Sequence, residues 1–279
     1  CTIPQIRGKV RSFDADYLAR EAAWLLERGV REIVLVAQDL TAWGRDLPGG
    51  RALPQLLDKL LPLPGLARLR LMYLYPAGMT EDFLRYLADG PANLLPYLDL
   101  PLQHAHPDIL RRMGRPFAQS PGAVLERIRK HLPGAALRTS LITGFPGESE
   151  EQFETLLDFV REARFQNLGV FAYQAEDGTA AAAMPGQLPE AIKEERRGRI
   201  MEAQAEISRE ILEGCLGSEL EILVDAPHPE WPGLFVGRAW FQAPEVDGVT
   251  YLSGENIRPG DLLKAEITES YDYDLAALV

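Results

Sequence analysis

Cysteine is scarce in this 279-residue sequence, which contains only Cys1 and Cys215. Two cysteines at opposite ends of a chain do not form the closely spaced disulfide framework of a small secreted protein. We therefore predict a reducing, cytoplasmic location, and we expect Cys215 to be a buried or inert free thiol. A thiolate is also a soft metal ligand, so Cys1 is a candidate ligand of an iron–sulfur cluster, which several thiolates normally hold together.

Long apolar runs are also missing. No stretch of about 18 apolar residues occurs, so no membrane span is expected. The sequence has no signal-peptide pattern, although a missing N-terminus would hide one. It starts at Cys1 without a methionine, which predicts a processed or truncated piece. An apolar content of 46% and a charged content of 25% are ordinary for a globular protein with one large core or two unequal ones.

Basic residues are outnumbered, most of all near the C-terminus. The whole chain has a formal net charge of −12, and residues 216–279 hold twelve acids against three bases, a net charge of −9. The acids are Glu219, Glu221, Asp225, Glu230, Glu245, Asp247, Glu255, Asp261, Glu266, Glu269, Asp272 and Asp274. Such a surface repels nucleic-acid phosphates and attracts basic partners. We therefore expect a basic protein partner and no direct binding of nucleic acid; the alternative is a surface that only keeps the protein soluble.

The first two-thirds of the chain alternates between two hydrophobic patterns. Short apolar runs predict strands, and amphipathic stretches between them predict helices. The expected strands are 32–37, 69–74, 97–100, 136–142 and 167–173, and the expected helices are 14–29, 53–61, 80–88, 107–113, 121–131 and 149–163. This alternation implies an α/β fold of parallel strands with right-handed crossovers. In a barrel of this kind, functional side chains gather at the C-terminal ends of the strands.

The pattern changes in the last third. Residues 175–189 are rich in alanine, glycine and proline and predict a connector, and residues 190–214 predict one long helix. After Gly217 apolar and polar residues alternate, which predicts about five short antiparallel strands. Such strands would form a small OB-like barrel. We therefore predict two domains, residues 1–214 and residues 215–279.

Polar side chains follow several of the predicted strands. Gln38 and Asp39 come after the first strand, and their oxygens can accept hydrogen bonds from an ammonium group. Gln103 comes after the third strand, and Arg112 and Arg115 lie at the end of the helix that follows it. An arginine fork can bind a carboxylate through two hydrogen bonds. These residues are candidate binding residues at the strand ends.

A sharp turn follows the fourth strand, which contains Ser140. Gly144 and Gly147 supply backbone freedom and close approach in this turn. Glu148 and the acids after it lie at the positive end of the helix that Ser149 opens. Because these acids already occupy that site, they oppose a phosphate ligand but tolerate a sulfonium.

Two further features remain at strand ends. Phe171 and Tyr173 end the last strand and are candidates for contact with the same ligand. His104 and His106 are spaced as metal ligands can be, so a metal-dependent hydrolase is an alternative to two hydrogen-bonded histidines.

The N-terminal stretch Cys-Thr-Ile-Pro-Gln-Ile-Arg-Gly-Lys-Val-Arg-Ser resembles a known motif. It is similar to the segment after the last cysteine of C-x3-C-x2-C in radical S-adenosylmethionine enzymes, and more narrowly in methylthiotransferases. The resemblance implies that Cys1 is the third ligand of a [4Fe–4S] cluster whose other two cysteines lie upstream of residue 1. The open iron of that cluster would bind S-adenosylmethionine.

The resemblance also assigns roles to the strand ends. It implies that Gln38 and Asp39 contact the amino group of the cofactor and that Gln103 lies near its ribose. It implies that Arg112 or Arg115 contacts the cofactor carboxylate. The segment with Ser140 and Gly144 would pack near adenine and methionine, and the strand end with Phe171 and Tyr173 would face the adenine edge.

The same resemblance implies an architecture and an activity. The fold would be a partial six-stranded barrel, with its first strand missing here, followed by a TRAM domain. The pattern Gln-Asp-x-Thr-x-Trp-Gly-x-Asp after the first strand is similar to members that modify ribosomal protein S12. Those members add a methylthio group to the β-carbon of an aspartate. They use an electron donor and a second [4Fe–4S] cluster on an N-terminal domain.

Two other functions stay open at this point. One is a tRNA adenine methylthiotransferase, which the Gln-Asp pair and the acidic C-terminal segment oppose. The other is a non-catalytic fragment that binds the ribosomal protein, since the chain as given lacks the upstream cysteines and is expected to be inactive alone.

Overall fold

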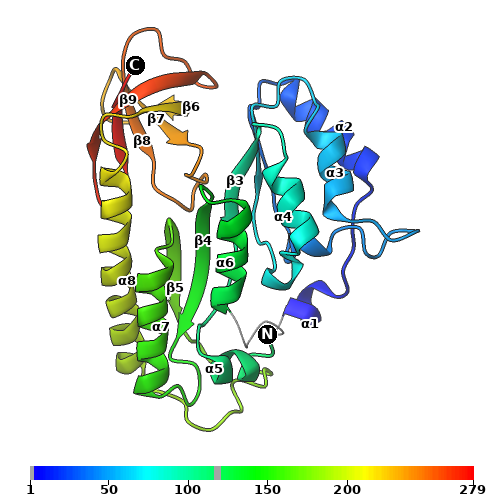
Figure 1. The fold of residues 1–279 in the computed structure, drawn as a ribbon, viewed down its shortest axis with the longest axis vertical. Coiled ribbons are helices and arrows are strands. Elements are labelled where there is room, and N and C mark those ends of the chain that lie inside the picture. Colours follow the sequence, from blue (N-terminus) through cyan, green and yellow to red (C-terminus); the bar gives the residue numbers. More distant parts are fainter. Residues whose placement is uncertain (1–2, 116–120) are drawn as a thin grey trace.

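The computed structural model describes residues 3–115 and 121–279, and its first part is an open parallel sheet flanked by helices (Figure 1). The strands lie in chain order: β1 (Glu32–Leu35), β2 (Arg68–Leu71), β3 (Leu94–Asp99), β4 (Ala136–Thr143) and β5 (Asn167–Ala172). The helices are α1 (Ile3–Arg7), α2 (Ala15–Leu26), α3 (Leu53–Leu60), α4 (Glu81–Ala88), α5 (Pro107–Arg112), α6 (Pro121–His131) and α7 (Glu150–Ala163), with short 3-10 turns η1 (Leu40–Ala42) and η2 (Pro76–Gly78). All five predicted strands are confirmed, with ends that differ by a few residues.

Side-chain caps explain where several helices begin. Asp14 accepts a hydrogen bond from the amide of Asp16 at 2.8 Å before α2. Thr80 accepts one from the amide of Phe83 at 3.3 Å before α4. Before α7, the Ser149 hydroxyl accepts a hydrogen bond from the amide of Gln152, and the Gln152 carboxamide oxygen accepts one from the amide of Ser149. These reciprocal bonds satisfy amides that a helix start otherwise leaves unpaired.

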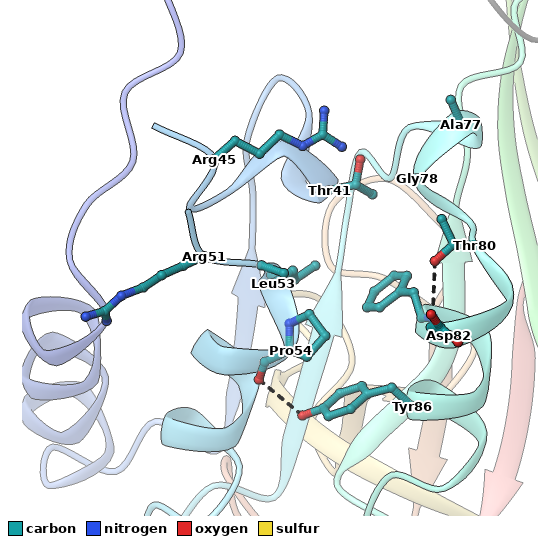
Figure 2. A pocket seen from close by; sticks show the side chains of 12 residues that line it. Thr41, Arg45, Arg51, Leu53, Pro54, Ala77, Gly78, Thr80, Asp82 and Tyr86 are labelled. Atoms are coloured by element: carbon teal, nitrogen blue, oxygen red, sulfur yellow. Dashed lines mark hydrogen bonds between the residues drawn. The ribbon is translucent and has the colours of Figure 1, made fainter. Parts of the chain in front are cut away.

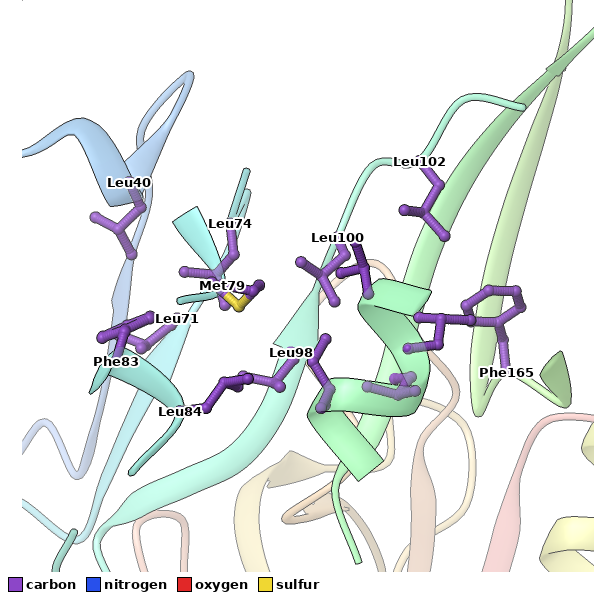
Figure 3. Packing of buried hydrophobic residues seen from close by; sticks show 14 of the residues in the cluster. Leu40, Leu71, Leu74, Met79, Phe83, Leu84, Leu98, Leu100, Leu102 and Phe165 are labelled. Carbon is purple, nitrogen blue, oxygen red and sulfur yellow. The ribbon is translucent and has the colours of Figure 1, made fainter. Parts of the chain in front are cut away.

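The two faces of the parallel sheet have different surroundings. Side chains alternate between faces along each strand. One face packs against the helices in a dense core, part of which Figure 3 shows as Leu71, Leu98, Leu100, Met79 and Phe83. The other face carries residues such as Arg70, Tyr97, Asp99, Arg138 and Phe171. The second face is the inner side of the half-barrel; Arg70, Tyr97 and Asp99 on it are fully buried, whereas Phe171 is exposed.

The last third forms a small barrel joined to the half-barrel by α8 (Glu190–Glu213). Its strands are β6 (Glu219–Pro227), β7 (Leu234–Ala239), β8 (Thr250–Ser253), β9 (Leu262–Ser270) and β10 (Leu275–Leu278), in the closed order β10-β8-β7-β6-β9. The prediction of a wholly antiparallel barrel is wrong, because β10 pairs with β8 in parallel. Strand directions cannot alternate all the way around a closed ring of five, so one neighbouring pair has to be parallel.

The small barrel packs against the N-terminal ends of the parallel strands, opposite to α5 (Figure 1). Met72, Leu95, Tyr97 and Ala136 of the half-barrel share one hydrophobic cluster with the apolar interior of the small barrel. Leu212, near the end of α8, belongs to the same cluster. The two parts therefore share buried surface.

A layer of buried charges crosses this junction. Arg238 of β7 donates from Nη1 to Glu32 Oε2 at 2.8 Å and from Nε to Asp225 Oδ2 at 2.7 Å. Arg70 donates to the other oxygen of Glu32 at 2.7 Å. Arg68 donates to the carbonyl oxygen of Arg238 at 2.8 Å. Glu32, Arg70 and Arg238 are thus paired away from water, and Asp225 binds Arg238 from the exposed edge of the layer.

Asp247 takes part in a second buried group. Its Oδ2 accepts a hydrogen bond from the Tyr97 hydroxyl at 2.6 Å, and Arg138 lies between Asp247 and Asp99, at 3.3 and 3.0 Å. Burial raises the pKa of Asp247 above its ordinary value, against the opposing effect of the Tyr97 hydroxyl. Asp247 is therefore wrongly counted among the acids of the outer surface.

No helix in the described part of the chain is long and apolar enough to cross a membrane.

Candidate functional site

The predicted ligand-binding residues lie where the parallel strands end, away from the small barrel. Gln38 and Asp39 follow β1, Gln103 follows β3, and Gly144 follows β4. Tyr173 follows β5 directly, and its amide donates to the Thr143 carbonyl at 2.9 Å. The fold thus collects the predicted strand-end residues at one rim, as parallel topology requires.

Gln103 is tied to β4 in an unusual backbone conformation. Its φ is +72°, which costs energy in a residue other than glycine. Its amide donates to the Ser140 carbonyl at 2.9 Å, and its carbonyl accepts from the amide of Ile142 at 2.7 Å. These bonds extend the β3–β4 pairing past the end of β3, so both Gln103 and Ser140 belong to the rim.

Hydrogen bonds that involve Thr41 and Ser12 hold the loop that contains Gln38 and Asp39. Gln38 is exposed, whereas the half-buried Asp39 accepts a hydrogen bond from the Thr41 hydroxyl at 2.6 Å. The Ser12 hydroxyl accepts from the amide of Gly44 at 2.9 Å. The N-terminal motif and the motif after β1, which lie far apart in sequence, therefore meet at the rim.

The turn after β4 closes on a buried carboxylate. Gly144 has φ +72°, and its amide donates to both oxygens of Glu148, each at 3.1 Å. Glu148 is only 4% exposed. Arg196 Nη1 donates to it at 2.6 Å, and His104 Nε2 lies 3.3 Å away. The sequence places Glu148 among the acids at the start of α7, and the structure shows that its side chain is paired inside the protein.

The protonation of this group follows from its contacts. Burial acts to raise the pKa of Glu148, but His104, the Gly144 amide and Arg196 outweigh burial and hold that pKa below its ordinary value. Burial also lowers the pKa of His104, against the influence of Glu148. We therefore describe the group as an ionised Glu148 beside a neutral His104.

The two histidines are bonded to nearby backbone. His104 Nδ1 accepts from the amide of His106 at 2.9 Å, and His106 Nδ1 accepts from the amide of Asp108 at 3.2 Å at the start of α5. No cluster of three or more histidine, cysteine, aspartate or glutamate residues suited to a metal ion occurs within residues 3–115 and 121–279. Both Nδ1 atoms are thus bound to backbone amides, as the alternative of two hydrogen-bonded histidines predicts.

The glycines of the turn make room for side chains of the protein. A Cβ on Gly144 would lie 2.4 Å from Lys193 Cγ, and a Cβ on Gly147 would lie 2.7 Å from Arg112 Nη1. Arg112 donates to the carbonyl oxygens of Pro146 and Gly147, at 2.6 and 3.3 Å. Its fork therefore braces the turn, whereas the Arg115 guanidinium lies 5.9 Å from the ring centre of Tyr75.

Phe171 and Tyr173 have different environments at the end of β5. Phe171 is 62% exposed, whereas Tyr173 is 8% exposed. Tyr173 packs edge-on against Phe145, with ring centres 5.4 Å apart, and Lys193 Nζ lies 5.6 Å from its ring centre. Phe171 is thus the accessible aromatic ring of the pair.

Both cysteines can now be placed. Cys1 lies outside the described residues, and so does any contact it makes with the rim. Cys215 is half-buried after α8, and burial raises the pKa of its thiol, which fits the inert role predicted for it.

Sequence reasoning missed a pocket of about 410 Å³ beside the rim (Figure 2). It lies between the start of α3 and the start of α4, with Leu53, Pro54, Phe83 and Tyr86 among its lining residues. Arg45 lies at its edge near Thr41 in Figure 2. Its lining comes from three stretches that are separate in the sequence, residues 41–45, 51–54 and 77–86, so no single motif marked it.

Residues 1–160 match the Radical SAM superfamily, and residues 216–279 match the TRAM domain. The chain is 60% identical over 279 residues to ribosomal protein uS12 methylthiotransferase RimO of Nitratidesulfovibrio vulgaris (strain DP4), covering 100% of this chain and 65% of that protein. It is 56% identical over 278 residues to the protein of the same name from Lawsonia intracellularis, covering 100% of this chain and 63% of the relative. Coproporphyrinogen III oxidase from Escherichia coli, a solved radical SAM enzyme, is 20% identical with a TM-score of 0.47, over 70% of this chain and 46% of the other.

The chain thus spans somewhat under two-thirds of the length of these curated relatives. The match to the Radical SAM superfamily covers more than half of the chain, including β1 to β4 and the rim that they form. The small barrel coincides with the TRAM match. The chain therefore belongs to the Radical SAM superfamily, and its small barrel is a TRAM domain.

Proposed function

We propose that the protein containing this chain is a methylthiotransferase that adds a methylthio group to the β-carbon of an aspartate in ribosomal protein uS12. One observation carries the proposal: over its entire length the chain is 60% identical to a relative named ribosomal protein uS12 methylthiotransferase. The concave face of the half-barrel, with its open rim, offers a place for the chemistry at the strand ends.

A Radical SAM domain implies a [4Fe–4S] cluster and S-adenosylmethionine, which together supply a 5′-deoxyadenosyl radical when bound. We propose Cys1 as one cluster ligand, with two cysteines upstream of residue 1 and a second cluster on a preceding domain. The described rim suits the zwitterionic cofactor, since it presents the exposed carboxamide of Gln38 and the carboxylate of Asp39.

The rim geometry also supports roles for the other candidate residues. We propose that Gln103 lies by the ribose and that Arg115 contacts the cofactor carboxylate while Arg112 braces the turn. Phe171 offers an exposed ring for the adenine. Ser140, Gly144 and Tyr173 act through the backbone and packing that shape the cleft.

The proposed reaction is tested on its product. In cells that lack the gene, uS12 should lose the mass of one methylthio group, and the intact gene should restore it. A gene with Cys1→Ser should not restore the mass, because the cluster would lose one ligand. Mass spectrometry of purified uS12 measures this change. Unchanged uS12 in the deletion strain would contradict the assignment, and a methylthio group missing from tRNA would favour the tRNA enzyme instead.

The acidic TRAM domain supports a basic protein client. Nine of its twelve acids are exposed: Glu219, Glu221, Asp225, Glu230, Glu245, Glu255, Glu266, Glu269 and Asp272. Of its three bases, Arg238 is buried. We propose that this surface attracts uS12, a basic protein, and repels tRNA. We also propose a cytoplasmic location, because the proposed client is a ribosomal protein. The TRAM match from residue 216 supports the proposed domain boundary at residues 214–215.

Binding of uS12 to the chain should weaken several-fold when the salt concentration rises from about 50 mM to about 300 mM, because salt screens exposed charges. Fluorescence anisotropy with labelled uS12 measures this affinity. The whole chain is used, since the TRAM domain shares buried surface with the half-barrel.

A matched pair of variants locates the effect. Glu266→Lys with Glu269→Lys should weaken binding, whereas Glu162→Lys with Glu202→Lys changes the net charge equally on α7 and α8 and should not. Equal weakening in both pairs, or equal affinity of the chain for tRNA, would contradict the proposed role of the TRAM surface.

A further inference from the structure

An exposed stack of aromatic rings lies on the TRAM domain, beside the loop between β6 and β7. The side chain of Trp231 in this loop is 61% exposed. The ring of His228 lies parallel to the indole, with ring centres 4.9 Å apart and an angle of 11° between the planes. The ring centre of Tyr251, on β8, lies 5.9 Å from that of His228. Three aromatic rings from two segments thus meet at the surface of the small barrel.

Hydrogen bonds hold the loop that carries this stack in one shape. His228 Nδ1 accepts from the amides of Glu230 and Trp231, each at 3.2 Å. The amide of His228 donates to the carbonyl of Leu234 at 2.8 Å, and the amide of Leu234 donates to the carbonyl of Trp231 at 3.2 Å. The loop also contains two prolines, which restrict its backbone. A ring that is already held in place loses little conformational entropy when it binds a partner.

The tryptophans of the chain differ in what covers their rings. Trp43 is buried and Trp240 is half-buried. Trp24 is 53% exposed, but the guanidinium carbon of Arg28 lies 3.7 Å from its ring centre. In the part of the chain that the structure describes, no lysine or arginine stacks on the indole of Trp231. Trp231 is therefore the exposed indole that a cation from another molecule can reach.

The outer face of the barrel beside the stack combines apolar and acidic side chains. The residues before and after Tyr251 on β8 are fully buried, so Tyr251 itself points outward. Tyr251 pairs with Ala276 of β10, which pairs with Glu269 of β9. Further along β10, Leu278 is 55% exposed and pairs with Glu266 of β9. Apolar surface bordered by carboxylates suits a cationic side chain with an apolar stem.

Arginine fits such a site better than lysine does. A guanidinium is planar and weakly hydrated, and it stacks on aromatic faces, whereas the lysine ammonium is compact and strongly hydrated. Indole attracts a cation more strongly than the other aromatic side chains do. The net charge of −9 in residues 216–279 also favours the approach of a cation.

We propose that Trp231, stacked on His228 and next to Tyr251, binds an arginine side chain of the basic protein client. The stack lies on the small barrel, away from the rim, so it acts in recognition of the client and takes no part in the reaction. The inference deepens the proposed function, on which it rests for the identity of uS12 as the client.

The test compares two labelled peptides of equal charge, one that alternates arginine with glycine and one that alternates lysine with glycine. Fluorescence anisotropy should show that the chain binds the arginine peptide about threefold more tightly, because only the guanidinium stacks well. The preference should disappear in Trp231→Ala and become smaller in Trp231→Phe. The matched control is Trp24→Ala, which removes an exposed indole that Arg28 already covers and should leave the preference unchanged.

Binding of uS12 gives a second readout. Trp231→Ala should weaken binding about tenfold at both about 50 mM and about 300 mM salt, because the ring is neutral and acts at short range. Glu266→Lys with Glu269→Lys should weaken binding mainly at the lower salt concentration, where charges are less screened. The two dependences on salt separate the aromatic anchor from the general attraction of the acidic surface.

Each outcome decides for or against the arginine site. A preference for the arginine peptide that requires Trp231 and survives Trp24→Ala supports it. Equal affinities for the two peptides, a preference that persists in Trp231→Ala, or equal losses in both tryptophan variants overturns it. If Trp231→Ala does not fold, Trp231→Phe decides by the same comparison. The peptides contain no uS12 sequence, so unmodified uS12 in cells together with a Trp231-dependent preference would refute only the proposed function.

Discussion

Replacing Arg238 with alanine should lower the free energy of unfolding by about 3–5 kcal/mol, because removing one partner of a buried ion pair leaves the other charge buried and uncompensated. The side chain of Glu32 is 4% exposed and would lose its ion pair with Arg238 while keeping the one with Arg70. Asp225 would lose both of its bonds from Arg238, at 2.7 and 2.9 Å. Urea unfolding of the chain, followed by circular dichroism, measures the change.

The control for Arg238→Ala is Arg209→Ala. Arg209 also joins the half-barrel to the TRAM domain, through Asp272 at 2.8 Å, but both side chains are at least half exposed. Exposed ion pairs contribute little because water and salt screen them, so this variant should unfold like the original chain. Equal destabilisation by the two substitutions would mean that the buried charge layer has no special part in holding the two domains together.

Replacing Gly144 with alanine should lower the free energy of unfolding by about 2–4 kcal/mol, from backbone strain and overpacking together. The φ of +72° disfavours any side chain. The added Cβ would also lie 2.4 Å from Cγ and 2.9 Å from Cβ of Lys193. Those atoms are the stem of the lysine, so α8 or the turn has to move. Urea unfolding measures the loss of stability.

Two comparisons separate the backbone strain in Gly144→Ala from the steric clash of the new Cβ with Lys193. Gly178→Ala places alanine at a φ of +79° with nothing within 4 Å, and should cost only about 1 kcal/mol. Lys193→Ala should partly rescue Gly144→Ala, because it removes the colliding Cγ although Cβ stays, and a double-mutant cycle measures this coupling. Additive effects of the two substitutions would contradict the collision.

Local sequence patterns predicted most of the fold. Asp14, Thr80 and Ser149 cap the helices they were expected to open, because a cap needs only residues within one helical turn. The five parallel strands follow from short apolar runs between amphipathic helices. The last strand, β10, was not located, because Leu-Ala-Ala-Leu alternates too weakly to mark it.

The candidate site was only partly predictable. The positions of Gln38, Gln103 and Gly144 at one rim follow from parallel topology. The left-handed backbone of Gln103 does not follow from the topology, because it depends on pairing with a strand that lies more than 35 residues away in sequence. The inward turn of Glu148 also depends on a distant partner, Arg196.

Periodicity, capping residues and turn chemistry act over a few residues, so the amino-acid order alone is enough to specify the helices, the strands and the rim at which the strands end. The amino-acid order does not specify in the same way which charged side chains are buried. Whether Glu148, Asp247 or Arg238 faces water depends on which oppositely charged groups arrive from distant segments, because burying an ion is favourable only when partners replace its hydration. That pairing exists only once the half-barrel, α8 and the TRAM domain have packed together.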